Sequence, residues 1–113
     1  MDETEAVQGF SALGNQSRLA IFRLLVRAGD KGSPTGRIGL ELGVPLSTLA
    51  HHIDCLSRAG LVNQRKMGRE VICTANYNTL LALTSYLTEQ CCEGLPEGAF
   101  KTAPAGAQEL ADA

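Results

Sequence analysis

Two adjacent cysteines, Cys91 and Cys92, are the residues of this chain whose types and spacing best suit chemistry. Neighbouring positions strain an ordinary disulfide and a cytosolic setting keeps thiols reduced, so the pair is interpreted as ligands, redox groups or packing residues. A soft thiolate pair selects thiophilic ions, and no histidines or carboxylates with zinc-ligand spacing accompany it. Trivalent arsenic or antimony therefore fits the pair better than zinc.

The geometry of a helix limits what two neighbouring thiols can hold. Side chains at i and i+1 point about 100° apart, so both sulfurs bind one ion only where the last turn loosens, which Gly94 and Pro96 favour. Cys73 could supply a third thiolate, whereas Cys55 falls on an apolar helix face and is interpreted as a packing residue. Without a third sulfur, a two-coordinate site suits a monomethylated trivalent arsenical, whose methyl group fills one valence. A pair that only packs is the alternative.

A second set of candidate residues consists of hydrogen-bonding and basic side chains in the middle of the chain. On one side of a predicted helix they are Ser47, Thr48, His51 and His52, and at the tip of a predicted hairpin they are Arg65, Lys66 and Arg69. Polar side chains on a helix read base edges in the major groove, and basic side chains bind phosphate. An exposed helix face that is simply solvated is the alternative interpretation.

The distribution of charge favours nucleic acid as the partner. Residues 16–69 hold nine lysines and arginines against three acids, a local balance of +6, whereas the rest of the chain holds one lysine against nine acids. The net charge of −2 and the pI near 5.6 therefore hide a basic segment between acidic ends. Binding to phosphates depends on the local field rather than on the total charge.

Hydrophobic periodicity and turn residues predict the elements that position these groups. Ser33 is expected to cap a short helix that opens with Pro34 and ends at Gly43. Pro45 is expected to open a second, amphipathic helix. Its apolar side consists of Leu46, Leu49, Ile53 and Leu56. The hairpin is expected to consist of strands over 61–66 and 70–74, with Met67 and Gly68 between them.

Helices are also predicted on both sides of this segment. Residues 2–13 read as an amphipathic helix, and Asn15 is expected to cap a following helix that is apolar almost all round and therefore buried. Asn76 or Asn78 is expected to cap a long last helix. The apolar stripe of this last helix is Leu80, Leu83, Leu87 and Cys91.

Five short motifs follow one another along the chain. They are Leu13-Gly14-Asn15-Gln16-Ser17-Arg18, Leu42-Gly43-Val44, Ser47-Thr48-Leu49-Ala50-His51-His52-Ile53, Ser57-Arg58-Ala59-Gly60-Leu61-Val62 and Gly68-Arg69-Glu70-Val71. Over roughly residues 12–92 the chain thereby resembles the ArsR/SmtB family of winged-helix repressors. The resemblance implies a homodimeric repressor that leaves its operator when an inducer binds. It also implies that Arg18 supports or contacts the DNA-facing side; a charge that bridges helices is the alternative.

The cysteine pair resembles the pair at the end of the last helix in some arsenite-responsive family members. The family's other metal motifs are absent from this chain. The first helix of the predicted helix-turn-helix begins Ser33-Pro34-Thr35-Gly36-Arg37, which contains no cysteine. We therefore expect a repressor released from its operator by trivalent arsenic (arsenite or methylarsenite) or antimonite bound at Cys91 and Cys92, with Cys73 as candidate third ligand. A thiol-redox or persulfide-sensing repressor on the same fold is the alternative function.

The expected architecture is mainly α-helical with a β-hairpin wing: a winged helix-turn-helix domain over residues 1–92 and a flexible tail over 93–113. A homodimer through the first and last helices would bury the apolar residues that a single chain leaves uncovered. They are Val7, Phe10, Leu80, Leu83 and Leu87. The sequence contains no catalytic triad, no phosphate loop and no apolar run of membrane-spanning length. We therefore expect a cytoplasmic protein that binds operator DNA and is not an enzyme.

Overall fold

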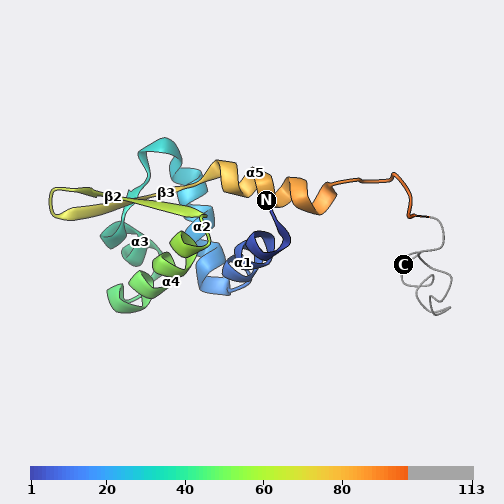
Figure 1. The fold of residues 1–113 in the computed structure, drawn as a ribbon. Coiled ribbons are helices and arrows are strands. Elements are labelled where there is room, and N and C mark those ends of the chain that lie inside the picture. Colours follow the sequence, from blue (N-terminus) through green and yellow to red (C-terminus); the bar gives the residue numbers. More distant parts are fainter. Residues whose placement is uncertain (97–113) are drawn as a thin grey trace.

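The computed structural model describes residues 1–96, which form helices packed around a small antiparallel sheet (Figure 1). The elements are α1 (Glu3–Leu13), α2 (Gln16–Ala28), a 3-10 turn (Gly29–Lys31), β1 (Ser33–Pro34), α3 (Thr35–Leu42), α4 (Leu46–Arg58), β2 (Val62–Met67), β3 (Glu70–Ala75) and α5 (Tyr77–Thr88). This is the predicted winged helix-turn-helix. Of the predicted tail over 93–113, residues 97–113 lie outside the described residues.

The sheet has the order β1-β3-β2, so that the last strand lies between the other two. β2 and β3 form an antiparallel hairpin in which Met67 pairs with Glu70, which leaves Gly68 and Arg69 as a two-residue turn. Gly68 has a φ of +63°, a conformation that glycine adopts without a steric penalty. The predicted hairpin is confirmed with its turn one residue later than expected. The hairpin projects away from the helices as the wing (Figure 1).

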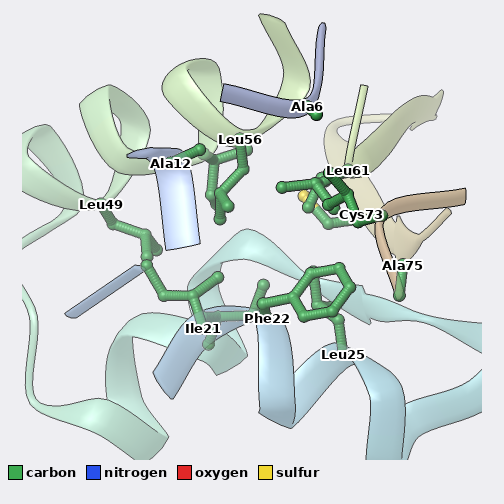
Figure 2. Close-up of a cluster of buried hydrophobic side chains, with 14 residues drawn as sticks. Ala6, Ala12, Ile21, Phe22, Leu25, Leu49, Leu56, Leu61, Cys73 and Ala75 are labelled. Carbon is green, nitrogen blue, oxygen red and sulfur yellow. The ribbon is translucent and has the colours of Figure 1, made fainter. Parts of the chain in front are cut away.

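The core lies between α2, α4 and the sheet, and α1 covers one side of it (Figures 1 and 2). Its largest fully buried side chains are Ile21, Leu25, Ile38, Leu49, Ile53, Leu56, Leu61, Leu83 and Cys73. α2 passes through the centre, as predicted, but only Ile21, Phe22 and Leu25 of it are buried. Its other apolar side, with Leu19 and Val26, stays partly exposed. Among the described helices, none combines the length and apolar character that crossing a membrane requires.

Local side chain to backbone hydrogen bonds begin the helices where the sequence predicts them. The side chain of Asn15 accepts from the backbone N–H of Arg18 at 3.0 Å, and that of Asn76 accepts from Thr79 at 3.4 Å. Gly43 ends α3 in the left-handed conformation, with a φ of +65°. These three of the four predicted caps are confirmed, because each depends only on residues close in sequence.

The predicted start of the short helix was wrong. Ser33 and Pro34 form β1, where they pair with Cys73 and Ile72 of β3, and the helix begins one residue later at Thr35. The Ser33 hydroxyl donates to the carbonyl of Pro34 at 3.2 Å and therefore caps nothing. Strand pairing with a segment far along the chain has overridden the local capping signal.

Candidate nucleic-acid interface and cysteine pair

α4 is amphipathic and presents a polar face to solvent. Leu49, Ile53 and Leu56 are buried against the core, whereas Ser47, Thr48 and His51 are exposed on the opposite side. Leu46, predicted as part of the apolar side, is 64% exposed at the first position of the helix. The exposed face can therefore enter a groove of DNA without disturbing the packing that holds the helix.

His52 differs from the other predicted groove residues because it lies half-buried beside Arg18. The guanidinium Nη1 of Arg18 lies 3.4 Å from Nδ1 of His52, and since arginine only donates, this ring nitrogen accepts. Burial, the charge of Arg18 and His51 together lower the pKa of His52 below its ordinary value. A neutral His52 thus helps to hold α4 in place.

Arg18 joins three helices at this point. Its Nε donates to the carbonyl of Ala12 in α1 at 2.7 Å, its own backbone belongs to the first turn of α2, and its Nη1 meets His52 of α4. The helix-bridging role, one of the two considered from the sequence, is therefore present in the structure. It also fixes the helix that carries the exposed face.

The wing carries exposed bases at and near its tip. Arg65, Lys66 and Arg69 are all exposed, as the sequence predicts. Arg65 and Lys66 are consecutive in β2 and therefore point to opposite faces of the hairpin. Gln64 donates from Nε2 to the Ser57 hydroxyl at 2.9 Å and so ties the wing to α4. This tie was not predicted, because no sequence pattern indicates a contact between a strand residue and a distant helix.

Arg37 is a further basic residue of this surface that the sequence analysis counted but did not assign. It lies in the first turn of α3, and with Arg69 it lines a hollow of about 680 Å³ between α3 and the wing turn. Its only ion-pair partner within residues 1–96 is Glu41, at 3.8 Å, on an exposed face. The first helix of a helix-turn-helix crosses the DNA backbone, and that position is the signal that could have identified Arg37.

The cysteine pair lies beyond the end of the last helix, and not on it as predicted. α5 ends at Thr88, whose carbonyl accepts from Cys91 N–H at 2.9 Å. Gln90 and Cys92 have φ values of +60° and +64°, which helical residues do not adopt. Cys91 and Cys92 are exposed, and their Sγ atoms lie 3.1 Å apart. The loosened chain that two neighbouring sulfurs need to reach one ion is therefore present.

The prediction of Cys73 as a candidate third ligand was wrong. Its side chain is 0% exposed within the core (Figure 2), and burial raises the pKa of its thiol to about 11. Cys55 packs half-buried against the core, in agreement with its interpretation as a packing residue. Over residues 1–96, no three cysteine, histidine or acidic side chains form a group that could hold a metal ion. The hydrogen bond with Cys92 raises the pKa of Cys91.

The apolar residues predicted for a twofold interface fall into three groups. Phe10 and Leu80 are half-buried against the core of their own chain. Leu83 is buried within the chain against Gly9 of α1, where a Cβ would lie 2.8 Å from its methyl groups. Its assignment to the interface was wrong. Val7 and Leu87 remain 61% and 67% exposed, together with Leu81 at 62%. α1 and α5 therefore leave an apolar surface that this chain does not cover.

Comparison with known proteins places the fold among transcriptional regulators. The family described as "Helix-turn-helix domain" matches residues 13–65. The chain is 38% identical over 64 residues to the uncharacterized HTH-type transcriptional regulator MJ1325 of Methanocaldococcus jannaschii, covering 57% of this chain and 70% of that protein. HlyU from Vibrio cholerae is 30% identical with a TM-score of 0.64, over 81% and 99% of the two chains. An ArsR-like transcriptional regulator from Rhodococcus superposes with a TM-score of 0.70 at 24% identity, over 96% and 89%. The chain belongs to the HTH-type transcriptional regulators, and its fold is that of the ArsR-like regulators.

As a helix-turn-helix protein with these relatives, the chain is a DNA-binding transcriptional regulator. Members of the family regulate transcription and are not enzymes, which confirms the prediction on catalysis. α3 and α4 are its helix-turn-helix, and the β2–β3 hairpin is its wing. On this fold the exposed face of α4 and the basic wing hold the residues that the sequence predicts to contact DNA.

Proposed function

We propose that this regulator is a homodimeric repressor that trivalent arsenic, as arsenite or methylarsenite, or antimonite releases from its operator by binding to Cys91 and Cys92. The observation that carries the proposal is the separation of 3.1 Å between two exposed sulfurs beyond the end of α5. Thiolates at this separation can share one thiophilic ion. A similar solved structure, 21% identical with a TM-score of 0.64, is described as a possible transcriptional regulator for arsenical resistance.

The absence of a third ligand near the pair within residues 1–96 favours methylarsenite over arsenite. A monomethylated arsenical needs only two sulfurs, because its methyl group already fills one valence. Cys73 cannot serve as the third, since its sulfur is enclosed by the core. We therefore expect one methylarsenite for each chain, with both thiols lost to titration.

The exposed apolar residues of α1 and α5 support the homodimer. Val7 and Leu87 would be covered by a second copy across a twofold axis. A winged helix-turn-helix domain from Mycobacterium bovis, 23% identical with a TM-score of 0.63, is described as homodimeric. The two copies of α4, roughly 34 Å apart, would then contact the two halves of a pseudo-palindromic operator.

Release would follow from a change at the dimer interface. An ion that binds both sulfurs reorders the chain next to the last turn of α5 and so alters the spacing of the two reading heads. Coupling of this kind typically amounts to about 1–3 kcal/mol, and it is reciprocal, so operator DNA should weaken binding of the arsenical by the same factor.

The test uses the double variant Cys91→Ser/Cys92→Ser and the matched control Cys55→Ser. Operator binding should be unchanged in both, while methylarsenite should release DNA from the wild type and from the control only. Fluorescence anisotropy of a labelled operator measures both effects. A double variant that still releases DNA when arsenical is added would exclude the pair as the site.

The same pair supports a second candidate function, a thiol-redox or persulfide switch. The close sulfurs hydrogen-bond to one another and are exposed, so an oxidant can reach them. One structure of HlyU, 29% identical with a TM-score of 0.61, is described as the reduced protein. Release by mild oxidant or by an organic persulfide, with no response to arsenicals, would favour this function over the first.

A further inference from the structure

The outer face of α2 carries apolar residues that the core does not use. Ile21, Phe22 and Leu25 bury the inner side of the helix, whereas Leu19 remains 45% exposed and Val26 39% exposed. Neither DNA reading nor the surface of α1 and α5 accounts for them. A helix that is apolar on both sides can hold the core together and bind something else on its outer side.

Leu19 and Val26 lie in a hollow of about 680 Å³ that four helices line. Leu24 of α2, Leu13 at the end of α1, Leu42 at the end of α3 and Leu80 of α5 complete its apolar walls. Ligand pockets for small molecules typically measure about 300–1,000 Å³ and are lined mainly by apolar side chains with a few polar groups. The hollow agrees with that description in size and lining.

Two arginines supply the polar groups. Arg23 and Arg27 lie one helical turn apart on the same wall, and neither forms an ion pair with an acid within residues 1–96. The acid that shares the lining, Glu41, is the partner of Arg37 at 3.8 Å. An adjoining hollow of about 410 Å³ also contains Arg27 and adds Lys31. The rim of the apolar hollow is therefore positively charged.

We propose that this hollow binds a small amphiphilic carboxylate, with its aliphatic chain against the leucines and its carboxylate between Arg23 and Arg27. The planar, multiply donating guanidinium matches a carboxylate in geometry as well as in charge. Arg23 and Arg27 are exposed and solvated without a ligand, so a purely apolar ligand would gain nothing from them. A simple inorganic anion would leave the leucines exposed. A molecule with both properties satisfies the whole lining.

The position of the hollow gives such a ligand a route to DNA binding. Leu42 ends the first helix of the helix-turn-helix, and Leu80 lies in the last helix, so one occupant would contact both. A ligand shifts the equilibrium between two arrangements only by its difference in affinity for them. A bound carboxylate that favours one arrangement of α2 against α3 and α5 should therefore change the affinity for the operator.

The experiment titrates the full-length protein with decanoate below its micelle concentration and, separately, with decan-1-ol, which has the same chain and no carboxylate. Calorimetry should show one decanoate bound for each chain and binding of decanol weaker by about tenfold or more. The double variant Arg23→Gln/Arg27→Gln should lose decanoate affinity to the same extent. Arg58→Gln, which removes one exposed helical arginine from α4, is the matched control and should bind as the wild type does.

Several results would overturn the proposal. Equal binding of decanol and decanoate, or unchanged affinity in the double variant, would mean that the arginines recognise nothing. Uptake of several decanoates for each chain, insensitive to every variant, would indicate binding as a detergent. A decrease in the mass of the assembly caused by Leu19→Glu, measured by sedimentation, would show that a second copy covers the hollow. The comparison of the two probes needs only the wild type and does not depend on the folding of any variant.

Discussion

Gly9 of α1 lies in close contact with Leu83 of α5, and its replacement gives a sharp test of the packing. A Cβ built at Gly9 lies 2.8 Å from two methyl groups of Leu83, closer than side chains pack. Leu83 is 1% exposed, so it has little room to move away. Gly9→Ala should therefore overpack this contact, at a cost of about 1–3 kcal/mol.

The matched control is Gly36→Ala in α3. Both substitutions replace a helical glycine by alanine, which by propensity alone stabilises a helix interior by about 1 kcal/mol. A Cβ at Gly36 meets nothing within 4 Å. Gly36 lies in the first turn of α3 and Gly9 inside α1, so the helix-propensity gain is no smaller at Gly9. The clash should therefore make Gly9→Ala less stable than Gly36→Ala by about 1–3 kcal/mol.

Urea unfolding followed by circular dichroism, at one protein concentration, measures this difference. In the double variant Gly9→Ala/Leu83→Val the smaller side chain makes room, and the two single effects should not add. If Gly9→Ala is as stable as Gly36→Ala or more stable, the close approach of α1 and α5 at this point is incorrect.

Three further predictions concern DNA, pH and assembly. Thr48→Ala should weaken operator binding by about 1–3 kcal/mol and relax sequence preference, whereas Arg37→Ala and Arg69→Ala should weaken specific and non-specific DNA alike and reduce the salt dependence; titrations at several salt concentrations distinguish these results. The pKa of His52 is lowered from 6.5 in the folded chain. The neutral ring therefore stabilises the fold above pH 6.5, and this contribution is lost as the pH falls through the lowered pKa. His52→Gln should flatten the pH dependence of the unfolding free energy, and an unchanged slope would refute this role of His52. Leu87→Glu should lower the mass of the assembly in sedimentation and weaken operator binding, while a fully active monomer would contradict the twofold arrangement.

The parts of the fold that the sequence predicts correctly are those that depend on near neighbours. Asn15, Asn76 and Gly43 act as caps through groups within a few residues, and the stripe of α4 follows from helical periodicity. The parts that it predicts incorrectly depend on distant contacts. Ser33 forms a strand because it pairs with β3. The hydrogen bond between Gln64 and Ser57 joins β2 to α4, and no sequence pattern predicts it.

The cysteines illustrate the same distinction. For Cys73 the alternation of a strand left both faces open, and pairing with Ser33 on one side and Gln64 on the other placed it in the core. For Cys91 the apolar stripe of α5 suggested a longer helix. Periodicity cannot show where a helix ends, and the extended backbone of Glu89, with a ψ of 132°, ends this one before the pair.

The distance between the cysteine pair and the reading head is bridged by a short series of contacts. Leu83 of α5 packs against Gly9 of α1, and α1 holds Arg18 through the carbonyl of Ala12 at 2.7 Å. Arg18 in turn meets His52 of α4 at 3.4 Å. A displacement of α5 that moves α1 therefore acts on α4 within one chain, without passing through the wing. Arg18 also donates from Nη2 to the carbonyl of Ser11 in α1 at 3.5 Å. Because Arg18 contacts both α1 and α4, a shift of α5 that moves α1 would also act on the position of α4.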